Sequence, residues 1–215
     1  MLYFAAIMAK CSLCSQRAAK RHCPAKGARI CSICCGTKRE VEIDCPSDCV
    51  YLRKGRSFES ARDHQHHPRQ STPQFNQQFL YRNTAAINAL AHAILEERVR
   101  APGMVDQDVR DALHALRATM KTLSSGIHYE TLPEGNVASM GLYRRIKPVL
   151  EQLMQPQGPT VDALRVSDIS ELLDFLLVTA ESRSSGRPRS RQYLDWLASV
   201  APEPPREEAS QIIVP

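Results

Sequence analysis

The fold of the first quarter of the chain is decided by residues 11–49, which read CSLCSQRAAKRHCPAKGARICSICCGTKREVEIDCPSDC. All 8 cysteines of the 215-residue chain lie in this segment. They form two Cys-x2-Cys pairs and one Cys-x3-Cys pair, a spacing that lets a short turn direct two thiolates at one ion. The pattern therefore predicts a metal centre. Its predicted ligands are Cys11, Cys14, Cys23, Cys31, Cys34, Cys35, Cys45 and Cys49.

Eight cysteines divide into two tetrahedral four-cysteine sites with none left over, which predicts two structural zinc ions. Adjacent residues tend to project in different directions, so Cys34 and Cys35 are assigned to different ions. One proposed set is Cys11, Cys14, Cys23 and Cys35, and the other is Cys31, Cys34, Cys45 and Cys49. His22 is an alternative to Cys23, and Cys34 and Cys35 can exchange roles. An iron–sulfur cluster and disulfide bonds are the less favoured alternatives.

The cysteine-rich segment has too few apolar residues to fold without help. Folding costs roughly 1.5 kcal/mol of conformational entropy per ordered residue. Its apolar side chains other than cysteine are nearly all in the set Leu13, Ile30, Ile33, Val41, Ile43, Val50 and Leu52. Binding of a structural zinc contributes on the order of 10 to 16 kcal/mol in finger peptides. We therefore expect this segment to be unfolded without metal.

Two local elements are expected near the last cysteines. Val41 and Ile43 alternate with acidic residues, which predicts a short strand over residues 39–43 with a solvated acidic face. Pro46 favours a helix start, so Cys45 and Cys49 are expected at the beginning of a helix. This order of turns, strand and helix over residues 11–52 resembles the treble-clef and cross-brace zinc modules, such as the HIT and MYND fingers. The resemblance implies a binding module, not an enzyme.

The positive charge of the chain is concentrated around the cysteines. Residues 9–70 contain 13 Lys and Arg against 6 Asp and Glu, whereas the rest of the chain is slightly acidic. A local positive field attracts nucleic acid or an acidic protein surface. Only Tyr51 and Phe58 are available there to stack on bases, which disfavours single-strand recognition. The candidate phosphate contacts are Lys20, Arg21, Lys26, Arg29, Lys38, Arg39, Arg53, Lys54 and Arg56.

The remainder of the chain predicts a mostly α protein. Apolar residues at helical spacing, interrupted by proline and glycine, predict an all-α bundle of about five helices. The most apolar helix, preceded by a capping box at Asp168 and Glu171, is expected to be central. The predicted organisation is a leader or mis-start (1–8), a zinc module (9–56), a linker (57–73), the bundle (74–200) and a disordered tail (201–215).

No catalytic motif is present in the sequence. It contains no phosphate-binding glycine loop, no His-Glu-x-x-His and no Gly-x-Ser-x-Gly. No apolar stretch approaches the roughly 20 residues needed to cross a bilayer, so a cytoplasmic protein with reduced thiols is expected. The sequence therefore predicts a zinc-binding adaptor or regulatory interaction module with a protein partner. The alternatives are nucleic-acid binding through the basic module and a redox sensor based on an iron–sulfur cluster or thiols.

Overall fold

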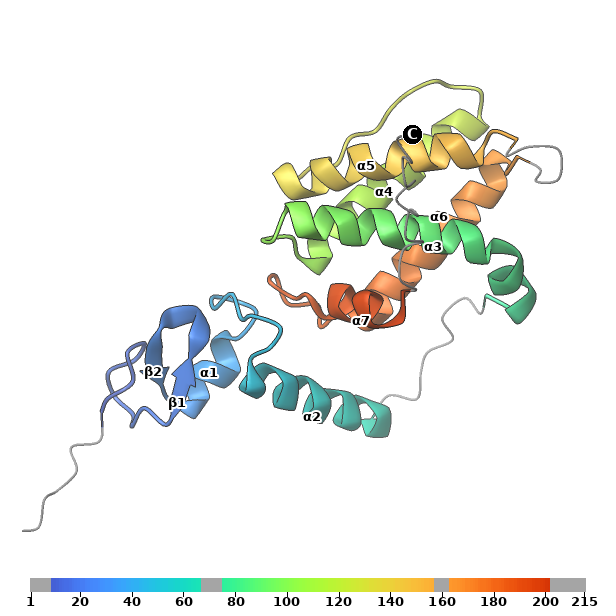
Figure 1. The fold of residues 1–215 in the computed structure, drawn as a ribbon. Coiled ribbons are helices and arrows are strands. Elements are labelled where there is room, and N and C mark those ends of the chain that lie inside the picture. The colour runs from blue at the N-terminus through green and yellow to red at the C-terminus, as the bar shows by residue number, and fades with distance from the viewer. Residues whose placement is uncertain (1–8, 67–74, 157–162, 202–215) are drawn as a thin grey trace, which may run out of the picture.

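A computed structural model describes residues 9–66, 75–156 and 163–201. The expected leader, the C-terminal part of the expected linker and nearly all of the expected tail lie outside the described residues. The described chain consists of a small cysteine-rich module followed by a larger helical bundle (Figure 1). The predicted mostly α class is confirmed, because one two-stranded sheet accompanies seven α-helices in the described part of the chain.

The module is built on a short β-hairpin followed by a helix. Strands β1 (Arg21–Cys23) and β2 (Ala28–Ile30) pair antiparallel, with Cys23 opposite Ala28. A 3-10 turn, η1 (Pro24–Lys26), joins them, and Gly27 closes it at φ 58°, a left-handed conformation that favours glycine. Helix α1 (Ser32–Lys38) follows directly. The hairpin therefore returns the chain from the third cysteine to the second Cys-x2-Cys pair.

The strand expected over residues 39–43 is not formed. These residues make a tight turn with one isolated bridge, in which the amides of Val41 and Ile43 both donate to the Lys38 carbonyl. Glu40 adopts φ 54° and is 1% exposed, whereas Val41 is 41% exposed. The expected alternation is wrong at residues 40 and 41, because the turn directs an acidic side chain inward and a valine outward, whereas Ile43 is buried and Glu42 is exposed as expected.

The helix after the last cysteine also differs from expectation. Helix α2 runs over Val50–His66, so Cys45 lies in the loop before it, whereas Cys49 directly precedes the helix and its carbonyl accepts from the Arg53 amide at 3.0 Å. The loop ends with the Cys49 amide donating to the Pro46 carbonyl at 3.0 Å. Residues 57–66, expected to belong to a linker, continue this helix.

The bundle contains the five expected helices: α3 (Gln77–Arg100), α4 (Asp106–Ser124), α5 (Val137–Leu153), α6 (Val166–Arg183) and α7 (Gln192–Val200). Pro148 is accommodated inside α5. The main contacts of α4 are with α5, α6 and α7, so α4 and not the more apolar α6 is the central helix. The capping box also lies one turn from the expected place, because Asp168 is the third residue of α6 and accepts from the Arg165 amide.

Helix α7 is capped by a residue from another helix. Its own N-terminal flanking residue, Arg191, provides no side-chain cap. Instead, the buried carboxylate of Asp106, at the start of α4, accepts hydrogen bonds from the amides of Tyr193 and Leu194 at 3.2 Å and from the Ser190 hydroxyl at 2.7 Å. These bonds satisfy helix-terminal amides that have no intrahelical partner. Asp106 thereby places α7 and the loop before it. None of the described helices is long and apolar enough to cross a membrane.

Candidate metal centre and its contacts with the helical bundle

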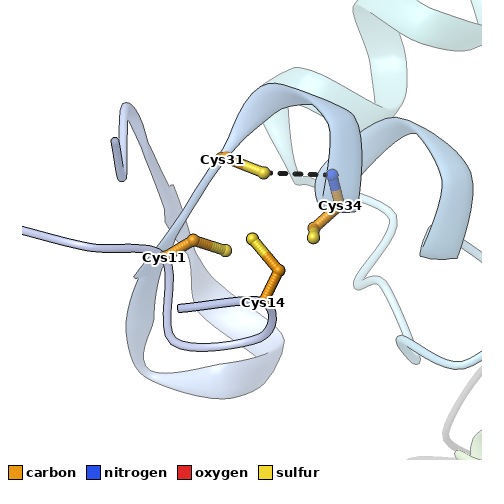
Figure 2. A group of neighbouring side chains, drawn as sticks. All are labelled: Cys11, Cys14, Cys31 and Cys34. Carbon is orange, nitrogen blue, oxygen red and sulfur yellow. Dashed lines mark hydrogen bonds between the residues drawn. The ribbon is translucent and has the colours of Figure 1, made fainter. Parts of the chain in front are cut away.

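Four cysteines converge on one point in the module (Figure 2). They are Cys11, Cys14, Cys31 and Cys34, and their Sγ atoms all lie within 4.8 Å of one another. Tetrahedral zinc with bonds of about 2.3 Å to sulfur requires sulfur–sulfur distances of about 3.8 Å. Small side-chain adjustments therefore suffice to coordinate one ion. This group could hold a metal through four sulfur ligands.

Backbone geometry positions each pair of thiols. After the first pair the chain turns through Ser15, at φ 53°, whose amide donates to the Cys11 carbonyl at 2.8 Å. Cys31 is the N-cap of α1, and its Sγ accepts from the Cys34 amide at 3.3 Å. Backbone donors at a helix start favour a negatively charged sulfur. The two turns therefore present thiols in an environment suited to thiolate ligands.

The thiols of this group have unequal acidities. Burial raises the pKa of Cys11, but backbone hydrogen bonds from Cys31, Cys14 and Leu13 outweigh it and lower the value to about 6. The hydrogen bond with Cys31, together with burial, raises the pKa of Cys34 to about 12. Thiols this close cannot all ionise without a cation, because their negative charges repel. Metal binding at this site therefore releases protons.

The predicted grouping of the cysteines is wrong in one respect. Cys31 and Cys34 join Cys11 and Cys14, whereas the predicted ligand sets place these two pairs at different ions. The cause is the hairpin, which folds the chain back so that the Ser12 amide donates to the Arg29 carbonyl at 3.2 Å. The two Cys-x2-Cys turns therefore face each other. Spacing along the sequence does not reveal this juxtaposition.

The other four cysteines line one small cavity that contains none of the first group. Cys23, Cys35, Cys45 and Cys49 line a cavity of about 10 Å³ together with Ile30, Ile43 and Leu52. The expectation that the two adjacent cysteines project in different directions is confirmed, since Cys34 belongs to the first group and Cys35 to this cavity. None of the eight thiols is in a disulfide. The alternative ligand His22 is exposed at the edge of the same cavity.

The predicted phosphate-binding residues separate into two classes. Arg39 is buried and donates to the Cys35 and Tyr51 carbonyls at 3.3 Å. Arg56 lies in an ion-pair cluster, as described below, while Lys38 pairs with Glu42 and Arg21 lies over the ring of Tyr51. These four side chains have structural contacts. The remaining candidates are exposed: Lys20, Lys26, Arg29, Arg53 and Lys54.

A set of polar contacts that no sequence motif predicts joins the module to the bundle. The buried carboxylate of Glu40 lies 2.6 Å from Arg56 on α2 and 3.7 Å from Arg187 in the loop before α7. In the same place the Arg189 amide donates to the Glu40 carbonyl at 2.8 Å. The left-handed turn at Glu40 therefore both directs its side chain inward and offers its carbonyl to the bundle.

A second point of contact lies at Asp195 on α7. Its carboxylate accepts hydrogen bonds from Ser47 at 2.8 Å and Arg56 at 2.6 Å, both in the module, and from Arg98 on α3 at 2.5 Å. Burial opposes ionisation, but these hydrogen bonds outweigh it and hold the pKa of Asp195 below its ordinary value. Asp195 is therefore a negative bridge between two arginines from different parts of the chain.

Charge complementarity was the sequence signal for this interface. The loop before α7 carries the arginines Arg187, Arg189 and Arg191. In the structure Arg191 pairs with Asp44 at 2.5 Å, and Arg187 pairs with Glu59 at 2.9 Å. The basic loop thus meets the acidic residues around Glu40.

Comparison of the chain with protein-family models, curated proteins and solved structures finds no match.

Proposed function

We propose that this protein is a non-enzymatic interaction protein in which bound zinc folds the cysteine module and the helical bundle holds it in place. The partner-binding surface is the outer face of α2. The observation that carries the proposal is the exposure of Val50 (51%) and Phe58 (70%) on this face. The likeness of the module to cross-brace zinc modules supports a binding role.

The two faces of α2 differ in chemistry. The inner face carries Leu52, which is 2% exposed, and Arg56, which pairs with Glu40 and Asp195. The outer face carries Val50 and Phe58 at helical spacing, beside the exposed cations Arg53 and Lys54. Exposed apolar side chains of this size flanked by positive charge suit a partner segment that is both apolar and acidic.

Affinity capture with the zinc-loaded full-length protein tests this proposal. The wild type is compared with Phe58→Asp in extracts of the native host, with and without nuclease, and captured proteins are quantified. Tyr81→Asp is the matched control, because Tyr81 is 86% exposed on α3, far along the chain from α2. We expect at least one nuclease-resistant partner to be lost with Phe58→Asp and retained with Tyr81→Asp. Equal capture by all three proteins would contradict the assignment of this face.

Nucleic-acid binding is a second candidate, favoured by the five exposed cations of the module. If they contact phosphates, binding of the full-length protein to duplex DNA or RNA should weaken steeply with salt, and the log–log slope should become shallower in Lys26→Gln and Arg29→Gln. No binding at low salt would exclude this function.

The identity of the bound metal distinguishes a zinc-folded interaction protein from an iron–sulfur redox sensor. Elemental analysis of protein purified without added metal should find zinc and no iron. Iron, or a coloured protein whose absorbance changes on reduction, would favour a redox sensor instead.

A further inference from the structure

We infer that Cys23, Cys35, Cys45 and Cys49 form a second metal site, and that its ion holds the loop through which the module docks on the bundle. This inference rests on the proposed function in taking zinc as the ion. It adds the ligand set and a specific role, because none of the four cysteines of the first site lies in the docking loop.

The cavity has the size and lining of a structural metal site. Its volume of about 10 Å³ is close to that occupied by one water-sized body. Cys23, Cys35 and Cys45 are each less than 10% exposed, and Cys49 is partly exposed. Among the described residues only the first group has all its sulfurs within 4.8 Å, so these four must rotate towards a common centre. Rotation between staggered χ1 conformers re-aims a thiol without moving the backbone.

The four cysteines come from three separate parts of the module. Cys23 ends β1, Cys35 lies on α1, and the last two lie in the loop before α2. That loop contains almost no regular structure to hold it, since only an isolated bridge and a few turn hydrogen bonds are formed between α1 and α2. Ligands at Cys45 and Cys49 would attach the end of the loop to the hairpin and to α1. Closing a loop at a metal removes much of its conformational freedom.

The same loop carries most of the contacts with the bundle. Between Cys35 and Cys49 lie Glu40, Asp44 and Ser47, which meet Arg187, Arg191 and Asp195 respectively. No residue from Cys11 to Cys34 takes part in these ion pairs and hydrogen bonds. The second ion is therefore placed to control docking, whereas the first ion joins the initial turn to the start of α1.

Metal content of paired variants tests the ligand set. Zinc per chain is measured by native mass spectrometry for full-length wild type, Cys11→Ser/Cys14→Ser and Cys45→Ser/Cys49→Ser, each refolded with excess Zn²⁺ and then desalted. We expect two zinc ions in the wild type and one in each variant. Equal zinc in the wild type and Cys45→Ser/Cys49→Ser would overturn the second site. Absence of zinc from the wild type would instead overturn the proposed function.

Hydrogen exchange tests the role of the second ion. In Cys45→Ser/Cys49→Ser we expect the protection factor of the Arg189 amide to fall at least tenfold, while the protection factors of amides in α4 stay unchanged. The single variant Cys49→Ser, which leaves three ligands, should give a smaller loss in the same direction. In Cys11→Ser/Cys14→Ser the Arg189 amide should remain protected. Loss of its protection in that variant alone, with none in Cys45→Ser/Cys49→Ser, would contradict the assigned role.

Discussion

Replacing Glu40 with glutamine should weaken docking of the module while preserving the shape of the side chain. Glu40 is 1% exposed and lies 2.6 Å from Arg56 and 3.7 Å from Arg187. Removing one partner of a fully buried ion pair costs about 3–5 kcal/mol. In Glu40→Gln, however, Arg56 still pairs with Asp195 and Arg187 still pairs with Glu59. The side-chain amide oxygen of the glutamine also still accepts one hydrogen bond. We therefore expect a loss of about 2 kcal/mol, or roughly a 30-fold shift towards the undocked state.

Native-state hydrogen exchange at Arg189 measures this loss directly. Its amide donates to the Glu40 carbonyl at 2.8 Å, so its protection reports the opening of the interface. Glu42→Gln is the matched control, because the Glu42 side chain is two residues away, 61% exposed, and paired with the nearby Lys38. We expect no measurable change in that control. Equal protection of the Arg189 amide in Glu40→Gln and the wild type would refute the reasoning.

Three further changes test other parts of the structure. Asp106→Ala removes the hydrogen-bond acceptor at the start of α7 and leaves buried donors unpaired, so the free energy of unfolding in urea should fall by about 3 kcal/mol. An unchanged free energy of unfolding would contradict the capping role of Asp106. Gly55→Ala would place a methyl group 1.4 Å from an Arg39 guanidinium nitrogen. We therefore expect a lower melting temperature of the zinc-loaded protein, despite a gain in helix propensity of about 1 kcal/mol. A higher melting temperature would show that the Arg39 side chain moves away freely. Because the folded-state pKa of Asp195 is lowered, its contribution is complete above its ordinary pKa and is lost as pH falls. The stability difference between wild type and Asp195→Asn should therefore be constant above about pH 5 and shrink below about pH 4, and a difference that grows with acidity would exclude this sign.

The amino-acid pattern alone is enough to predict the helical class and the segment that carries the candidate metal centre. Cys-x2-Cys pairs in a segment with so few apolar residues have few roles other than metal binding. Helical periodicity in the bundle can be read from the sequence whichever way the helices pack. The same local logic separated Cys34 from Cys35, because adjacent side chains on a helix point to different places. These features depend on neighbours within about one turn of the chain.

Which cysteines meet, and how the module is held against the bundle, depend on contacts between segments far apart in the chain. The hairpin brings Cys31 beside Cys11, a contact between residues 20 positions apart that spacing cannot encode. The turn at Glu40 reverses an apparent strand pattern, because its buried charge is compensated by Arg56 and Arg187 from distant segments. An acidic side chain is predicted to face water unless its partners are known. The docking interface therefore follows from charges that become neighbours only after the chain has folded.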